Sequence, residues 1–209
     1  ASATLCVTKA VNGLYDGDET FEFKLAKVDD ATSDVIANDT AEAENGATAT
    51  FEAIKYTDEG DYYYSITEQS GDTTGMFYDT AAKYAYVHVE MKDGELQATT
   101  IRYGDSIEEA EGNLLDRLIE FFTGGQESLT VTNTFSVVKI SQTDLATSGE
   151  LKGAVLTVTQ KKDAGGADVN PDDAYSTQWT SDGEAAHEIY GLKDGTYIAR
   201  SEERFSRNA

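Results

Sequence analysis

The feature that most constrains this chain is a series of short segments in which apolar and polar residues alternate. Successive side chains of a β-strand point to opposite faces, so each segment has one face for a core and one for solvent. Turn-forming stretches such as "NGLYDGDE" and "KDGE" separate the segments. The segments are "TLCVTKAV", "TFEFKLAKV", "ATATFEAIKY", "DYYYSITEQ", "KYAYVHVEM", "ELQATTIRY" and "SLTVTNTF". This pattern predicts an all-β sandwich of antiparallel strands.

A second, shorter series of alternating segments begins at Val137. Its segments are "VVKISQTDL", "GAVLTVTQKK", "STQWTS", "AAHEIYGL" and "GTYIARSEE". The chain has 209 residues, which is enough for two small domains that each bury a core. We therefore predict two tandem domains, at residues 1–136 and 137–209.

One segment of the first domain breaks the alternation. In "SIEEAEGNLLDRLIEFFTGG", Ser106 and Glu109 have the spacing of a capping box, and two glycines close the segment. This pattern predicts a helical insertion over 107–122, weakened at Gly112.

Charge and composition exclude several classes of function. The net charge of −23 would repel phosphate backbones and anionic lipid surfaces, so we expect no nucleic-acid partner and no membrane partner. A single cysteine, Cys6, rules out an internal disulfide. The acidic loops lack the ligand spacing of an EF-hand, so we expect no metal, and no motif indicates a cofactor. Composition alone leaves the localisation open.

Three polar side chains fall on the apolar phase of three different strands. Lys9 alternates with Leu5 and Val7, Glu68 follows Tyr64 and Ile66 in phase, and Asn133 follows Leu129 and Val131. An unpaired buried amide costs about 1 to 3 kcal/mol, so these groups need either partners or a chemical task. One reading is a buried ion pair with an amide partner; another is that a strand phase is misjudged.

A chemical task accounts for all three residue types together. Burial disfavours charge, which favours a neutral lysine amine beside a neutral glutamic acid. The amine of Lys9 would attack the side-chain carbonyl carbon of Asn133. Glu68 would polarise that carbonyl and pass a proton to the departing ammonia, as the catalytic acid. The fold would supply the proximity that an amine and an amide otherwise lack. The product would be an isopeptide cross-link.

Here the sequence resembles the Gram-positive pilin and adhesin domains with self-forming Lys–Asn isopeptide bonds. It is similar in particular to the Streptococcal pilin isopeptide-linkage domain, from Thr4 to about Phe135. The motifs that carry the resemblance are "VTKAV", "FEFKL", "YYYSITEQ", "FYDTAAKYAYVHV" and "VTNTF". The resemblance implies an immunoglobulin-like sandwich with a lysine on the first strand, a glutamate after Tyr-x-Ile-x, and an asparagine near the end.

The second domain resembles the Cna B-type, prealbumin-like domains through "VKISQTDLATSGELKGAVLTV" and "WTSDGEAAHEIYGLKDGTY". By this resemblance Lys139 is the candidate cross-linking amine. Ser201 occupies the position where the glutamate is expected, while Glu202 is one step away and faces the other side. The resemblance also implies a last strand that supplies the acceptor, which we expect this domain to lack. Asn208 is a poor substitute for that acceptor.

The sequence thus predicts an extracellular, cell-surface structural protein, a shaft or stalk segment of a bacterial pilus or adhesin. Its partners would be neighbouring pilin or adhesin subunits. Apart from the single-turnover reaction on itself, we expect no enzyme activity. An alternative is an adhesive module that binds a host protein or glycan through Tyr62, Tyr63, Tyr84 and Tyr86 or through the helical insertion. A glycosidase is a more distant alternative, because its paired carboxylates are not apparent.

Overall fold

The computed structural model describes residues 1–28, 39–112, 129–144 and 146–202. The chain divides into two compact units, Ala1–Phe135 and Ser136–Ala209. We call them unit 1 and unit 2. Both consist of β-strands and turns, and the one helix in the described residues lies in unit 1. This arrangement confirms the all-β class predicted from the alternating segments.

Unit 1 contains two sheets. The strands of the larger sheet are β3 (Phe21–Val28), β4 (Asp39–Ala43), β7 (Gly60–Glu68), β9 (Lys83–Lys92) and β10 (Glu95–Gly104). They are antiparallel in the order β10-β9-β7-β3-β4. The smaller sheet consists of β2 (Cys6–Asn12), β5 (Thr48–Thr50), β8 (Met76–Phe77) and β11 (Leu129–Phe135), in the order β5-β2-β11-β8. A short ribbon pairs β1 (Ser2–Ala3) with β6 (Ile54–Lys55).

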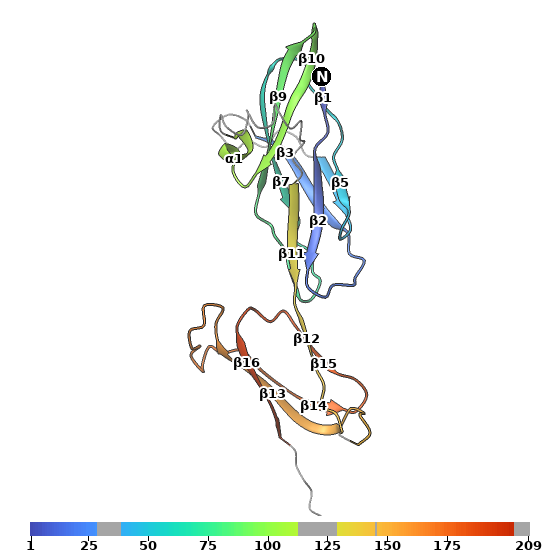
Figure 1. Ribbon diagram of the computed structural model, residues 1–209, viewed down its shortest axis with the longest axis vertical. Helices are drawn as coiled ribbons and strands as arrows, with labels where there is room; N and C mark the ends of the chain where they lie inside the picture. Colours follow the sequence, from blue (N-terminus) through green and yellow to red (C-terminus); the bar gives the residue numbers. More distant parts are fainter. Residues whose placement is uncertain (29–38, 113–128, 145, 203–209) are drawn as a thin grey trace, which may run out of the picture. The chain divides into compact units, whose positions relative to one another are not determined.

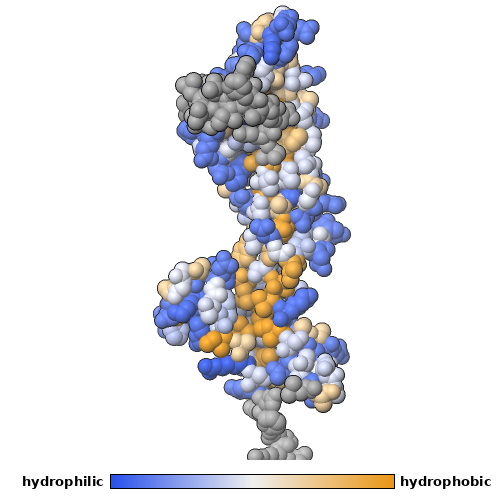
Figure 2. Space-filling view, viewed as in Figure 1, coloured by the Kyte–Doolittle hydropathy of each residue, from blue (hydrophilic) through white to orange (hydrophobic). Residues whose placement is uncertain are grey.

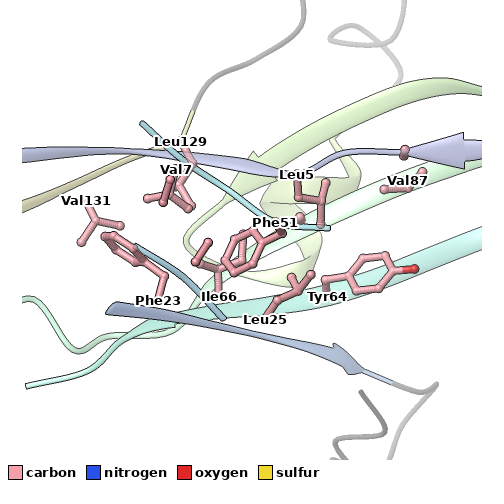
Figure 3. Packing of buried hydrophobic residues seen from close by; sticks show 14 of the residues in the cluster. Leu5, Val7, Phe23, Leu25, Phe51, Tyr64, Ile66, Val87, Leu129 and Val131 are labelled. Atoms are coloured by element: carbon pink, nitrogen blue, oxygen red, sulfur yellow. The ribbon is translucent and has the colours of Figure 1, made fainter. Parts of the chain in front are cut away.

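The two sheets of unit 1 share one hydrophobic core. Val7 and Val131 of the smaller sheet face Phe23 and Ile66 of the larger one (Figure 3), and all four are at most 2% exposed. Burial of each such side chain contributes about 1.5 to 3 kcal/mol to the free energy of folding. The buried residues follow the alternation of the sequence, so the apolar phase of each segment is the phase that faces the core.

The first and last long strands of unit 1 lie side by side (Figure 1). β2 and β11 pair in parallel, with Val131 opposite Lys9 and Asn133 opposite Val11. Residues more than a hundred positions apart therefore share one sheet. This parallel pair is the structural reason why side chains from the two ends of the unit can meet.

The helix covers the outer face of the larger sheet. Helix α1 (Ile107–Glu111) begins at the predicted cap, where the Ser106 hydroxyl accepts a hydrogen bond from the Glu109 N–H at 3.2 Å. It contacts β9 and β10. At Gly104 a Cβ atom would lie 2.5 Å from the Ala110 nitrogen, so the close approach of the helix requires glycine there. The helix ends at Glu111, and the rest of the predicted span, 113–122, lies outside the described residues.

Unit 2 repeats part of the strand pairing and strand order of unit 1. Its strands are β12 (Val137–Ile140), β13 (Lys152–Lys162), β14 (Ser176–Asp182), β15 (His187–Tyr190) and β16 (Thr196–Glu202). β12 pairs antiparallel with β15, as β2 does with β5. The order β14-β13-β16 of unit 2 matches the order β4-β3-β7 of unit 1. Counted from β12 in unit 2 and from β2 in unit 1, with the short strand β6 left out, the second strand lies between the third and the fifth in both sheets. Unit 2 therefore contains counterparts of the first half of unit 1.

The core of unit 2 is small. Its buried hydrophobic residues in the described part of the chain are Ala154, Leu156, Val158 and Ile189. Hydrophobic residues also gather on its visible surface in Figure 2, and Val138 and Ile198 are each 39% exposed. Whether unit 2 lacks a last strand stays a prediction, because residues 203–209 lie outside the described part.

We expect hydrogen exchange to distinguish the first strands of the two units. β2 has neighbours on both sides, β5 and β11, whereas within the described residues β12 pairs with β15 alone. Unpaired backbone amides exchange more readily, so the amides of β12 should exchange faster than those of β2. Mass-spectrometric hydrogen exchange on the whole chain measures both strands in one experiment. Equal protection of the two strands would contradict this expectation.

Candidate functional site

The fold brings the three polar residues of the apolar phase together in the core of unit 1. Lys9 comes from β2, Glu68 from the end of β7, and Asn133 from β11. Their exposed fractions are 0%, 2% and 0%. The three strands belong to both sheets, so the cluster spans the space between them. All three strand phases predicted from the sequence are confirmed.

Glu68 binds both of the other side chains. The amine of Lys9 donates to its Oε2 atom at 2.8 Å, and the amide Nδ2 of Asn133 donates to its Oε1 atom at 2.5 Å. The two carboxylate oxygens are thus divided between the amine and the amide. Within the described residues, no buried side-chain nitrogen or oxygen lacks a hydrogen-bond partner.

The other end of the Asn133 amide is held by the backbone. Its Oδ1 atom accepts a hydrogen bond from the N–H of Asp79 at 2.8 Å. The reversed amide would place its NH₂ group against the Asp79 N–H, and two donors facing each other repel. The carbonyl contact that the sequence assigned to Glu68 therefore comes from Asp79. Sequence reasoning missed Asp79 because a backbone N–H has no residue-type signature.

The surroundings of the amine are apolar. The ring centroid of Phe21 lies 4.6 Å from the Lys9 Nζ atom, and the Val131 carbonyl oxygen lies 3.5 Å from it. Burial lowers the pKa of Lys9 below its ordinary value, and the hydrogen bond and charge of Glu68 oppose this shift only in part. The site thus favours the neutral, nucleophilic form of the amine more than water does.

A buried cluster of this kind contributes little to the free energy of folding, so a purely structural role does not explain it well. Desolvation of a buried ion pair offsets much of its Coulomb attraction, and well-packed apolar residues often stabilise a core as well or better. The chemical content of the site is more specific. It places an amine, a carboxyl group and a carboxamide in one buried cluster, and these are the groups that attack on an amide with proton transfer would require.

Unit 2 does not repeat this cluster in its described part. Lys139 has a 61% exposed side chain and forms an ion pair with Glu188 on the neighbouring strand at 2.7 Å. Glu68 stands opposite Phe23 in unit 1, and Ser201 stands opposite Leu156 in unit 2. Phe23 and Leu156 are both buried, so Ser201 matches Glu68 in strand pairing, but Ser201 is exposed whereas Glu68 is buried. Asn208 lies outside the described residues.

The remaining candidates do not form a second reactive cluster. Cys6 is half-buried, and its Sγ atom lies 3.8 Å from the hydroxyl of Thr50. In the described residues, no group of His, Cys, Asp and Glu could hold a metal ion. None of the helices described here has the length and apolar character needed to cross a membrane.

The tyrosine surface considered from the sequence differs in the structure. Tyr86 is only 1% exposed, and its hydroxyl donates to Asp61 at 2.7 Å. Its ring packs against Tyr63, with the centroids 5.6 Å apart. Alternation placed Tyr86 outside the core, but on that face its ring and hydroxyl contact Tyr63 and Asp61 of the neighbouring strand β7. Tyr86 is therefore not part of an exposed binding surface.

Comparison with known proteins gives one family match and several similar solved structures. Residues 5–136 match the model of the FctA family, described as the Spy0128-like isopeptide containing domain. No curated protein sequence matches the chain significantly. Among solved structures, the chain is similar to the major pilin from Streptococcus pyogenes, with 18% identity over 97% of this chain and 82% of that chain (TM-score 0.44). The streptococcal ancillary pilin is 14% identical over 99% of this chain and 60% of its own length (TM-score 0.30).

We expect the Lys9 amine to titrate below the ordinary lysine value of about 10.4 in an Asn133→Ala variant, which has no amide to attack. Burial is the physical reason. The unfolded chain then binds the extra proton in the interval between the folded and unfolded pKa values. The stability of this variant should therefore rise with pH across that interval and fall as pH drops through the folded pKa. Nitrogen NMR of the lysine side chains measures the titration, and a midpoint at or above about 10.4 would contradict the expectation.

Proposed function

Because the chain belongs to the Spy0128-like isopeptide containing domain family, we propose that unit 1 joins Lys9 to Asn133 by an isopeptide bond, with Glu68 as the acid–base group. The observation that carries the proposal is the position of Glu68. One of its oxygens contacts the attacking amine, and the other contacts the nitrogen that would leave.

The reaction balances within these three side chains. The neutral Lys9 amine attacks the Asn133 Cγ atom, and a bond forms between Nζ and Cγ. Glu68 accepts a proton from Nζ and delivers a proton to Nδ2, since it contacts both nitrogens. The bond between Cγ and Nδ2 then breaks, and one ammonia leaves. The carboxyl group ends in the protonation state in which it began, so no external acid, base or cofactor is consumed.

The bond would tie together the two ends of unit 1. It closes a loop of about 124 residues, and the chain-entropy model for disulfides of that length gives about 4 to 5 kcal/mol of stabilisation. Lys9 and Asn133 lie on the paired strands β2 and β11. A pulling force that enters near residue 135 and leaves near residue 1 would pass through the bond, so the strands between them carry little load.

A covalently closed sandwich suits a protein that bears mechanical load. The protein is a pilin-like isopeptide domain protein. Its role is that of a shaft or stalk segment in a pilus or surface adhesin outside the cell, with neighbouring subunits as partners. The chemistry occurs once per molecule and acts on the protein itself, which sets it apart from an enzyme with turnover.

We expect the purified chain to weigh less than its sequence mass by one ammonia, and not by two. Unit 1 has the complete set of amine, acid and amide, whereas in unit 2 the residue that matches Glu68 in strand pairing is Ser201. Intact-mass spectrometry gives the answer directly. An unmodified mass would contradict the cross-link in unit 1, and a loss of two ammonias would contradict the assignment for unit 2.

We also expect a Glu68→Gln variant to keep its full sequence mass while remaining folded. The substitution retains the shape of the side chain but removes the group that transfers the proton. A matched Glu42→Gln variant changes an exposed glutamate on β4 and should lose one ammonia as the parent protein does. Thermal stability is a poorer measure here, because breaking a buried pair costs about 3 to 5 kcal/mol by itself. Loss of ammonia from Glu68→Gln would contradict the role of Glu68.

A further inference from the structure

In the described residues, the Asn133 oxygen accepts its hydrogen bond from a backbone N–H and not from a side chain. When the amine attacks Cγ, an electron pair moves onto Oδ1 and makes it an oxyanion. Glu68 contacts Nδ2, so it is placed to serve the leaving group rather than the oxygen. The oxygen is bonded by the N–H of Asp79 at 2.8 Å. We propose that this backbone N–H is the oxyanion donor of the cross-linking reaction, a role that rests on the proposed function of unit 1.

The geometry suits this task. A donor 2.7 to 3.1 Å from the developing charge, in a site without water, is worth far more than it is in bulk solvent. The Asn133 side chain is fully buried, and the Asp79 N–H binds its oxygen while Glu68 binds its nitrogen. The donor keeps its proton throughout the reaction. It stabilises charge on Oδ1 as the C=O bond opens and until it re-forms with the departure of Nδ2.

The segment that carries the donor is held by β11 itself. β8 pairs antiparallel with the end of β11, with Phe77 opposite Thr134 and Met76 opposite Phe135. Two residues after Phe77, the chain reaches Asp79 beside Asn133. The strand that supplies the reacting amide therefore also positions the segment that supplies its donor.

Side-chain contacts hold the same segment at Tyr78. The Tyr78 hydroxyl donates to Glu19 at 2.5 Å and accepts a hydrogen bond from the Thr73 N–H at 3.2 Å. At Gly71 a Cβ atom would lie 2.4 Å from both the Glu19 Oε1 atom and the Tyr78 hydroxyl, so a side chain there would displace this contact. The residue before the donor is thus fixed from two directions.

The Asp79 carboxylate faces away from the reacting atoms. Its Oδ1 atom accepts from the Ala81 N–H at 3.2 Å, and its Oδ2 atom lies 3.4 Å from the Lys83 amine. Lys83 also binds Asp105 at 2.9 Å. These contacts occupy the side chain within the turn after β8, while the N–H of the same residue points to Asn133. Asp79 therefore contacts the Asn133 oxygen through its backbone, while its carboxylate acts on the site through its charge, which raises the pKa of Lys9 against the lowering by burial. The two variants compared below both lack this carboxylate.

The test compares two variants of the whole chain, Asp79→Ala and Asp79→Pro. Both remove the carboxylate, but only proline also removes the N–H. Each protein is made by cell-free synthesis, synthesis is stopped, and intact mass is followed over time to give the rate of ammonia loss. Removal of one oxyanion donor slows catalysis by about 100- to 1000-fold. We expect that slowing for Asp79→Pro relative to Asp79→Ala.

A second comparison removes the N–H without restricting the backbone. Lactic acid incorporated at position 79 differs from Asp79→Ala by one ester oxygen in place of the N–H. The same slowing is expected, with circular dichroism and hydrogen exchange of β2 and β11 unchanged. The pH at which the rate is half-maximal should also stay the same, because the donor does not titrate; a change in the packing of Lys9 or Glu68 would shift it.

The outcomes separate this inference from the function on which it rests. If the parent chain itself loses no ammonia, the proposed cross-link is wrong. If the parent chain and Asp79→Ala lose ammonia but the folded ester variant loses it equally fast, the cross-link stands and the Asp79 donor is wrong. Slowing by the ester in a folded protein with an unchanged pH profile supports the donor.

Discussion

The structure of unit 1 depends on the two hydrogen bonds that Glu68 makes inside its core. A buried lysine, a buried glutamate and a buried amide would each be strongly unfavourable alone. Glu68 gives the amine one oxygen and the amide the other, so the cluster satisfies itself without water. The same two contacts that satisfy the cluster also connect the proposed nucleophile with the proposed leaving group. Packing and chemistry therefore impose the same geometry on β2, β7 and β11.

The sequence predicted the strand phases because alternation reports directly on which side chains share a face. Lys9, Glu68 and Asn133 were identified in this way, since each is a polar residue in an otherwise apolar phase. The two-residue strand β8 is too short for any periodicity, and the Asp79 N–H is common to all residues except proline. Burial of Tyr86 was missed for a related reason. Alternation reports on the face toward the core, whereas Tyr86 is buried on the other face, in contact with Tyr63 and Asp61 of β7.

The two units share part of their strand order but differ in the residues at the candidate site. Their first strands carry lysines in similar sequence contexts, "VTKA" and "VVKI", and the order β14-β13-β16 of unit 2 matches β4-β3-β7 of unit 1. Lys9 is buried against a glutamate that lies opposite a core phenylalanine. Lys139 is exposed beside Glu188, and the residue paired with the buried Leu156 is an exposed serine, Ser201. The proposed function therefore depends on the residues that the strands carry rather than on the strand order.

The central claim is a covalent bond between two named side chains, and peptide mapping tests it most directly. The whole chain is digested with a protease after denaturation, and the fragments are sequenced by tandem mass spectrometry. We expect one branched peptide in which the segment with Lys9 is joined to the segment with Asn133, with the loss of one ammonia. Recovery of both segments only as separate linear peptides, each with its unmodified mass, would show that the cross-link does not form.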